Sequence, residues 1–282
     1  MTIETPQDAT AQGEIDGTAT AVPSCSTSSP SRNAFTTLMT STKRKLTMPP
    51  PSARKSKHHF ASRDGLSAYT KNPSSYPSSR VIFHDESFVA IHDLYPKSSV
   101  HTLLLPRSEE LALLHPFDAF ADAEFLAQCR VQAAKLKGIV GKELQRRYGL
   151  CSKQDSGREA ILSGEVELGD AEDLPIGRDW EKDIRVGIHA HPSMNHLHIH
   201  VLSVDRYSEC MRYRKHYNSF ATPFFVPLED FPLAEDDVRR HPTKEGYMGR
   251  ELKCWRCGRG FGNKFVELKA HLEEEFEEWK KE

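Results

Sequence analysis

Three histidines alternate with apolar residues in His196-Leu197-His198-Ile199-His200, and the apolar pair Val201-Leu202 follows them directly. Because alternate side chains of a β-strand point to one face, this pattern predicts a strand that carries a row of imidazoles about 7 Å apart. Burying three titratable rings on one face costs folding energy unless they find partners or take part in chemistry. The alternative, an edge strand with solvated histidines, explains strict alternation poorly. The pattern therefore predicts a reactive site within a sheet.

Such a row suits chemistry at phosphorus. A neutral imidazole is a competent nucleophile near pH 7, and neighbouring rings can orient it and bind phosphate oxygens. His198, at the centre, is the predicted nucleophile, and His189 is the predicted acid if its segment pairs with the histidine strand as a hairpin. Lys97 and Lys215 are candidates for neutralising phosphate charge, and Ser193 for a hydrogen bond. Taken singly, such lysines are usually solvated and such serines usually cap turns.

The length of 282 residues allows one sizeable domain and a smaller one. Residues 1–57 are rich in Thr, Ser, Pro and Ala, which predicts a disordered tail. Between Arg32 and Lys57 there are seven Lys/Arg and no acidic residue, which suits nuclear import, with a merely solvated tail as the alternative. Residues 34–39 include an apolar patch that is a candidate docking peptide for a repair protein.

The compartment follows from what the sequence lacks. It contains no apolar run of the ~20 residues that a membrane span needs, and no signal-peptide pattern. Its six cysteines do not form a disulfide framework. We therefore expect a chain without membrane partners in a reducing compartment, specifically the nucleus.

Residues 58–220 have the pattern of an α+β domain with a mixed, mainly antiparallel sheet and one long helix. Apolar residues recur at helical spacing over 118–148, which predicts that helix. The stretch 151–183 carries ten acidic residues against four basic ones, so we expect a solvated insertion loop there. Besides the histidine strand, strands are expected at 81–83, 88–91, 102–106 and 184–189.

The C-terminal region carries the spacing of a metal site. Cys254 and Cys257 form a Cys-x-x-Cys knuckle, and His271 follows after thirteen residues. Zinc prefers four ligands in a tetrahedron. Glu275 lies one helical turn after His271 and shares its helix face, so it is the expected fourth ligand, with Glu274 or water as the alternative.

A small ββα zinc finger is therefore assigned to residues 253–282, and a connecting segment to 221–252. A single finger seldom reads a base sequence by itself. Phosphate contacts position a protein on DNA without specifying sequence. The predicted phosphate contacts are the basic residues around the knuckle, Lys253, Arg256, Arg259 and Lys264.

The run 196–202 resembles the His-x-His-x-His-x-x signature of the histidine-triad nucleotide hydrolases and transferases. Three further runs resemble the aprataxin branch of that family, the DNA-adenylate hydrolases: Asp93-x-Tyr95-Pro96-Lys97, His189-Ala190-x-Pro192-Ser193-Met194 and Lys215-His216-x-Asn218-Ser219-Phe220. The similarity covers roughly residues 60–282 without the acidic insertion. The forkhead-associated domain of animal aprataxins has no counterpart, so the resemblance is to the fungal type.

The resemblance implies that His198 attacks the AMP phosphorus and that His189 protonates the departing DNA 5′-phosphate, before water releases AMP from a transient AMP–histidine. It also implies that His200 contacts the phosphate and His196 holds the row in place. Asp93 would lie near the ribose, and the phosphates would be surrounded by Lys97, Ser193 and Lys215. The implied partners are DNA with adenylated 5′ ends and the product AMP.

The resemblance supports the Cys-Cys-His-Glu ligand set for one structural zinc ion, with no metal needed for the chemistry. Two other functions stay open at this point. One is a general histidine-triad hydrolase of small nucleotides, such as dinucleoside polyphosphates or nucleoside phosphoramidates. The other is a non-catalytic DNA-binding module with structural histidines.

Overall fold

A computed structural model of the chain describes residues 63–169 and 173–282. The predicted tail, residues 1–57, with its basic clusters and its candidate docking peptide, lies outside the described residues. In the part that is described, no helix is long and apolar enough to cross a membrane.

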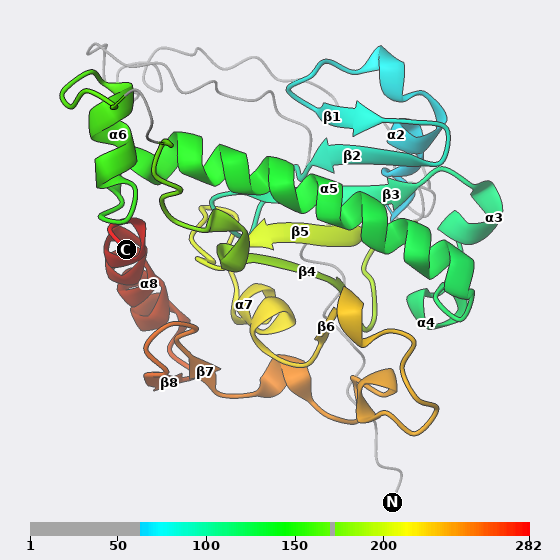
Figure 1. Cartoon of the computed structure of the whole chain (residues 1–282). Helices are drawn as coiled ribbons and strands as arrows, with labels where there is room; N and C mark the ends of the chain where they lie inside the picture. The colour runs from blue at the N-terminus through cyan, green and yellow to red at the C-terminus, as the bar shows by residue number, and fades with distance from the viewer. Residues whose placement is uncertain (1–62, 170–172) are drawn as a thin grey trace, which may run out of the picture. The chain divides into compact units, whose positions relative to one another are not determined.

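The centre of the fold is an antiparallel sheet with the strand order β1-β2-β3-β5-β4-β6 (Figure 1). Its strands are β1 Val81–His84, β2 Phe88–His92, β3 His101–Pro106, β4 Ile184–His189, β5 Ile199–Ser203 and β6 Phe225–Pro227. The strands expected at 81–83, 88–91, 102–106 and 184–189 are confirmed to within one residue, whereas the histidine strand begins at Ile199, three residues later than predicted. The α+β class is confirmed. The histidine strand β5 lies in the interior of the sheet, where both of its edges are hydrogen-bonded.

One face of the sheet is covered by the long helix α5, Ala123–Tyr148 (Figure 1). The helix begins later than predicted, because the Asp122 carboxylate caps it by accepting from the backbone N–H groups of Glu124 and Phe125. Residues 118–119 belong instead to a separate short helix. Val131, expected on the apolar face, is exposed, because the buried stripe of α5 runs elsewhere: Phe125, Leu126, Cys129, Ala133, Leu136, Val140 and Leu144.

The opposite face of the sheet carries the histidines and is covered by α7, Arg214–Ala221. Strand alternation produces this division, because Ile199 and Val201 belong to the core under α5 whereas His200 points the other way. Gly187, opposite His200, makes room for β6: an added Cβ would lie 2.5 Å from the Val226 carbonyl oxygen. Only glycine fits that close approach.

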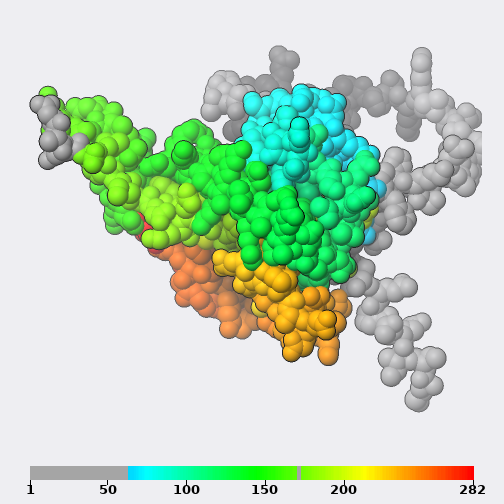
Figure 2. Space-filling view, turned by 45° about the vertical axis from the view of Figure 1, so that its right-hand side comes forward, coloured from blue at the N-terminus to red at the C-terminus, as the bar shows by residue number. Residues whose placement is uncertain are grey.

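The acidic segment 151–183 is not a solvated loop throughout, which corrects the sequence prediction. It contains the helix α6, Ser156–Leu162, which projects at the upper left of Figure 2. The Asp155 carboxylate is fully buried and accepts from the Arg178 backbone N–H at 2.9 Å and from Trp180 Nε1 at 2.8 Å. The ends of the insertion are therefore anchored by a buried carboxylate that charge counting cannot reveal.

The segment 221–252, expected to be a linker, contributes the edge strand β6 to the main sheet. The finger itself consists of β7, Leu252–Lys253, β8, Gly260–Gly262, and α8, Phe265–Lys280. Helix α8 serves two cores, because Leu268 and Leu272 pack within the finger while Phe276 and Trp279 join the core of the sheet. The finger and the sheet accordingly form one compact unit, Asp64–Glu282.

Short helices connect these elements. The α-helices are α2 Ser67–Lys71, α3 Glu109–Ala112 and α4 Pro116–Ala119. The 3-10 helices are Pro73–Ser75, Gly149–Cys151, Trp180–Asp183, Leu228–Asp230, Val238–Arg240 and Tyr247–Gly249.

Candidate active site and metal centre

His198 is held by its own chain in one tautomer. Its Nδ1 lies 2.7 Å from the carbonyl oxygen of His196, and the ring is buried. A carbonyl oxygen can only accept, so Nδ1 carries the proton and the lone pair is on Nε2. A lone pair at Nε2 is what a nucleophilic imidazole needs, so this backbone hydrogen bond prepares His198 for attack.

His200 is the end of a directional hydrogen-bond chain. The backbone N–H of Lys97 donates to Nδ1 of His101 at 3.1 Å, so the His101 proton is on Nε2. That Nε2 lies 2.9 Å from Nδ1 of His200 and donates to it. The proton of His200 is thereby placed on Nε2, a buried atom with no hydrogen-bond partner among the described residues. A buried, unsatisfied N–H is a donor ready for an anionic oxygen.

His101 is the functional residue that the sequence reasoning missed. It is buried on β3, 99 positions before His200, and its Nδ1 is also 3.5 Å from the Asp93 carboxylate. His101, His200 and Asp93 lie close enough together to suggest a metal, but the hydrogen bonds already account for the imidazoles. The available signal was its place at the start of a predicted strand, beside the Lys97 run.

His189, at the end of β4, faces the same pocket. Its ring centroid is 4.5 Å from that of His200, and its Nε2 is buried without a hydrogen-bond partner in the described structure. The hairpin predicted for β4 and the histidine strand is confirmed, with Gly187 opposite His200. His189 and His198 are therefore brought to one side of the sheet, as the predicted roles of His198 as nucleophile and His189 as acid require.

Burial keeps the pocket imidazoles neutral. Desolvation lowers the pKa of His101 to about 4, and it lowers the pKa of His189 and of His200 well below the usual value of 6.5. Positive neighbours act in the same direction, and Lys97 is one of them for each of the three rings. The predicted charge clamp Lys97 is thus close to the histidines, while its Nζ donates to the Tyr95 carbonyl at 2.8 Å.

His196 does not share the row, which corrects the strand prediction. It lies in a bend before β5, where Asn195 donates to the Asp64 carboxylate at 2.7 Å and draws the segment aside. The rings of His198 and His200 are 4.9 Å apart and nearly perpendicular, not stacked in a straight series. His196 contributes to the pocket through its backbone carbonyl, which orients His198.

The other predicted phosphate contacts flank the pocket. Ser193 is exposed in the turn after β4, and Lys215 lies in the first turn of α7. Asp93 follows β2, and its carboxylate accepts from the backbone N–H of Tyr95 at 2.7 Å, which keeps it beside His101. The contacts of these residues with a substrate stay predictions.

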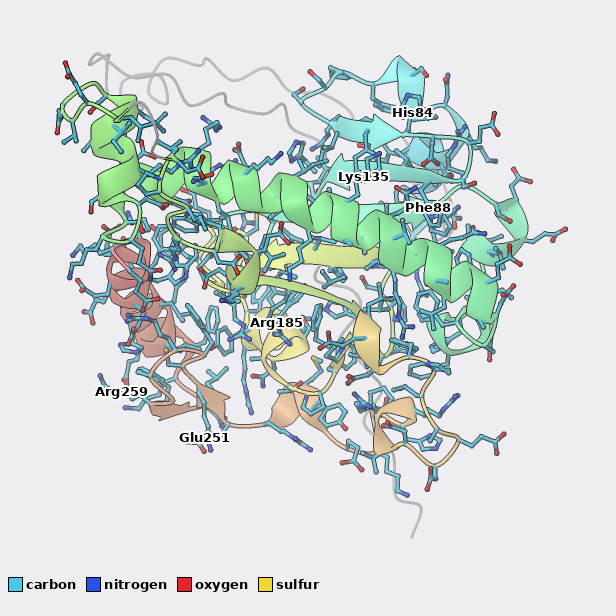
Figure 3. All side chains as sticks on the ribbon, viewed as in Figure 1. His84, Phe88, Lys135, Arg185, Glu251 and Arg259 are labelled. Atoms are coloured by element: carbon cyan, nitrogen blue, oxygen red, sulfur yellow. The ribbon has the colours of Figure 1, made fainter. Side chains whose placement is uncertain are left out.

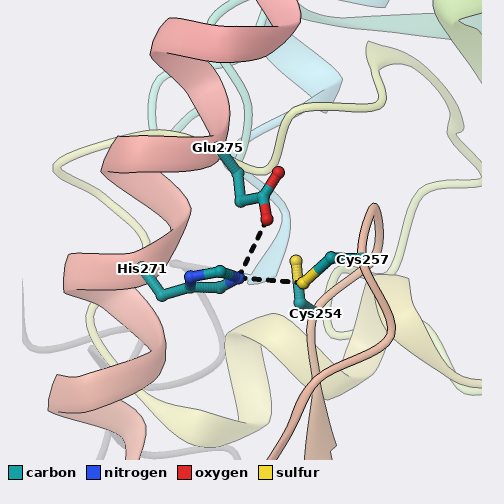
Figure 4. A group of neighbouring side chains, drawn as sticks. All are labelled: Cys254, Cys257, His271 and Glu275. Carbon is teal, nitrogen blue, oxygen red and sulfur yellow. Dashed lines mark hydrogen bonds and ion pairs between the residues drawn. The ribbon is translucent and has the colours of Figure 1, made fainter.

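The predicted metal ligands Cys254, Cys257, His271 and Glu275 converge, with one donor atom from each lying within 4.8 Å of the others (Figure 4). Nε2 of His271 is 3.1 Å from Cys257 Sγ and 3.1 Å from Glu275 Oε1. Two sulfurs, an imidazole and a carboxylate suit Zn²⁺, and a complete set of four protein ligands is typical of a structural site. The donor set therefore fits one structural zinc ion.

Arg256 pairs with this cluster, while its predicted contact with a DNA phosphate stays a prediction. Its Nη1 donates to Glu275 Oε2 at 2.6 Å, and it also pairs with Glu282. This hydrogen bond lowers the pKa of Glu275 and turns the other carboxylate oxygen toward His271. The remaining predicted phosphate contacts, Lys253, Arg259 and Lys264, are exposed.

Comparison with known proteins agrees with both sites. Residues 76–207 match the HIT domain, and residues 221–278 match the C2HE / C2H2 / C2HC zinc-binding finger. The chain is 34% identical over 249 residues to an aprataxin-like protein of Schizosaccharomyces pombe, covering 88% of this chain and 94% of that protein. It is 33% identical to an aprataxin-like protein of Saccharomyces cerevisiae, covering 76% of this chain and 95% of that protein.

Among solved structures, the aprataxin ortholog Hnt3 in complex with DNA is similar, with a TM-score of 0.59 and 33% identity over 77% of this chain and 96% of that chain. The histidine pocket, the four-ligand cluster and these relatives together place the chain in the aprataxin family.

Proposed function

We propose that this chain is a DNA 5′-adenylate hydrolase, which removes AMP from abortive ligation intermediates during single-strand break repair. The main support is the fixed tautomer of His198, whose Nε2 lone pair shares a buried pocket with the unsatisfied Nε2 atoms of His189 and His200. A nucleophile beside two unpaired polar nitrogens suits a substrate whose reacting group is an anionic phosphorus centre.

In the first step, His198 Nε2 forms a bond to the phosphorus of AMP, and the bond from that phosphorus to the oxygen of the DNA 5′-phosphate breaks. The DNA leaves with its 5′-phosphate, and AMP stays on the histidine. The His200 Nε2–H donates to a non-bridging oxygen, where negative charge develops. Lys97, Ser193 and Lys215 surround the phosphates.

His189 is neutral in the empty pocket because burial lowers its pKa. The negative charge of the entering phosphates favours its protonated form, so His189 takes up a proton with the substrate and donates it to the departing oxygen. In the second step the neutral ring accepts a proton from water as that water attacks phosphorus. The nitrogen–phosphorus bond then breaks, AMP leaves and His198 is restored.

This sequence uses side chains alone at the phosphate, and we propose that it needs no metal there. A zinc ion held by Cys254, Cys257, His271 and Glu275 would cross-link the finger hairpin to α8. The finger would present Lys253, Arg259 and Lys264 to DNA phosphates beside an adenylated 5′ end. The solved complex of a relative with DNA supports such a substrate.

The test is AMP release from a nicked duplex that carries a 5′-adenylate, with diadenosine tetraphosphate as the rival substrate. We expect His198→Ala to reduce DNA deadenylation by at least about 10³-fold, because removal of a nucleophile abolishes the covalent route. His191→Ala, a change at an exposed histidine of the neighbouring turn, is the matched control and should stay near wild type. Faster turnover of the dinucleotide than of DNA would identify a small-nucleotide hydrolase instead.

We also propose that the protein acts in the nucleus, where its DNA substrate would arise. The basic cluster Lys43-Arg44-Lys45 supports this location. A fluorescent fusion should be nuclear, and replacement of the three residues by glutamine should spread it through the cell. An unchanged distribution would remove this cluster from the proposal.

A further inference from the structure

The C-terminal end of α7 is held by two arginines that no part of the proposed chemistry uses. The Phe220 carbonyl oxygen accepts from Nη1 of Arg185 on β4 and from Nη2 of Arg206, the latter at 3.2 Å. Figure 3 shows Arg185 beside α7. The last carbonyls of a helix lack partners within the helix and carry partial negative charge, so a cation there is favourable.

It is unusual for one carbonyl oxygen to accept hydrogen bonds from two guanidinium groups. Arg206 is 8% exposed and has a φ of 50°, a left-handed conformation that side chains rarely adopt. Arg185 lies over the Phe225 ring at 4.5 Å. Burial, with repulsion from Arg206, lowers the pKa of Arg185 to about 10. Arg206 also interacts with Tyr217 of α7, whose ring centroid lies 5.5 Å from its guanidinium. The fold thus tolerates strain, desolvation and like-charge repulsion to hold both arginines against α7.

The ring of the residue they hold forms a wall of the histidine pocket. The Phe220 centroid is 4.6 Å from that of His189, 5.2 Å from that of His200 and 5.5 Å from that of His101. Phe220 is itself buried and packs with Leu202 and Phe225. Its ring therefore excludes water from the same imidazoles that hold and deliver protons in the proposed reaction.

We propose that Arg185 and Arg206 are a pair of positioning residues that clamp the Phe220 carbonyl and thereby keep its ring against the pocket histidines. Neither arginine needs to touch the substrate. The role deepens the proposed function, and its activity readout rests on that function.

The clamp has a consequence for pH dependence. His189 is faced by His101 on β3, His198 before β5, and Lys97, and His200 is faced by these groups and by His189. Burial and these neighbours together hold both rings neutral. When Phe220 loosens, water enters and the imidazoles are protonated at a higher pH. Neutral His189, which accepts the proton from water in the second proposed step, is then lost at a higher pH, so the acid limb of AMP release moves upward.

The experiment compares Arg185→Gln, Arg206→Gln and the double variant in AMP release between pH 5.5 and 8, together with NMR titration of the imidazoles. Each single variant leaves one donor, so we expect small shifts. The double variant should shift the acid limb and the imidazole titration upward by about one pH unit, and by more than the two single shifts together. Phe220→Leu should reproduce that shift.

Arg146→Gln, at an exposed arginine that pairs with Glu143 on α5, is the matched control and should leave the profile unchanged. A folded double variant with wild-type imidazole titration would overturn the clamp. If the double variant does not fold, Arg206→Lys must keep the titration of the wild type while Arg206→Met shifts it, and equal behaviour of the two overturns the clamp. Absence of AMP release in the wild type would instead overturn the proposed function, and the NMR titration would still decide the clamp.

Discussion

The histidine pocket holds several imidazoles and the metal cluster holds one, His271, and the two regions provide partners for imidazole nitrogens in opposite ways. In the pocket, the protein itself supplies the partners: His198 donates to a backbone carbonyl, and His101 donates to His200. In the cluster, the donors converge on one another, with Cys257 Sγ and Glu275 Oε1 each 3.1 Å from His271 Nε2. Lone pairs that face one another are stabilised only when a cation lies between them.

The two regions nevertheless share a helix. His271 and Glu275 lie in the middle of α8, between finger residues and the residues Phe276 and Trp279 that enter the core of the sheet. Tyr207 stacks on Phe276 with ring centroids 4.3 Å apart. The two regions therefore share structural support, and the proposal that the pocket works without the metal can be tested by removing the ion.

The largest effect that tests this independence should come from Cys257→Ser. We expect it to lose zinc and to lower Tm by roughly 10 °C, because structural zinc contributes folding energy directly and a few kcal/mol moves Tm by several degrees at this chain length. Below its Tm, the variant should release AMP from a small adenylate within about 3-fold of wild type, since the proposed chemistry in the pocket uses side chains alone. Metal analysis, calorimetry and the small-substrate assay measure the three outcomes.

Cys151→Ser, at an exposed cysteine outside the cluster, is the control and should change none of them. If small-substrate turnover fell in proportion to zinc content, the two regions would be chemically coupled and the comparison would fail.

Local patterns predict most of the scaffold. Short apolar runs between turn residues predict β1 to β4, and the Cys-x-x-Cys knuckle with His271 and Glu275 predicts the metal ligands, because each of these signals lies within one short stretch of the sequence. The edge strand β6 is missed, since a three-residue strand between prolines carries too little periodicity. Buried Asp155 is missed because nothing in an acidic stretch marks which carboxylate finds buried donors.

The candidate site divides in the same way. His189, His198 and His200 can be found from alternation and hairpin spacing, whereas His101 becomes visible only once β3 pairs with β5, which places Leu103 opposite His200. Register between strands 99 residues apart is set by the whole core and not by either segment. Likewise, the pairing of Arg256 with Glu275 becomes visible only in the fold, because nothing in the sequence marks which basic residue near the knuckle faces this carboxylate.

The next prediction concerns the pocket alone, and specifically how much buried His101 makes the stability of the fold depend on pH. The pKa of His101 is about 4 in the fold against a usual 6.5, so the unfolded chain binds its proton first as pH falls. The contribution of His101 to the free energy of unfolding is therefore fully present above about pH 6.5. It declines by about 3 kcal/mol as the pH falls to 4. Denaturant unfolding of wild type and His101→Gln between pH 7 and 4 measures it. His101→Gln should flatten the decline, and parallel profiles would show that His101 is not the group responsible.

A second prediction for His101 concerns activity: His101→Phe should lower kcat by about 10²-fold. Without the His101 donor, the His200 proton can move to Nδ1, and the phosphate oxygen loses its hydrogen bond. His101→Gln can keep a donor and should retain more activity, while KM should change little in both variants. His84→Phe, at an exposed histidine on β1, is the control. Wild-type kcat in His101→Phe would mean that the orientation of His200 does not depend on this chain.

The smallest predicted effect concerns the surface of the finger, where exposed basic side chains, and not buried groups, are expected to set the affinity for DNA. Lys253 is exposed, and the Arg259 guanidinium lies over the Phe261 ring at 5.1 Å (Figure 3). Reversing each charge should weaken binding to nicked duplex by about 10-fold at low salt and lower the salt dependence by about one counterion, because each residue is proposed to contact one phosphate. Lys182→Glu, at an exposed lysine next to β4, is the matched control. Turnover of the small adenylate should be unchanged in all three variants, which again separates the finger from the pocket. If affinity and salt slope stayed at wild-type values, the DNA surface would have to lie on another part of the molecule.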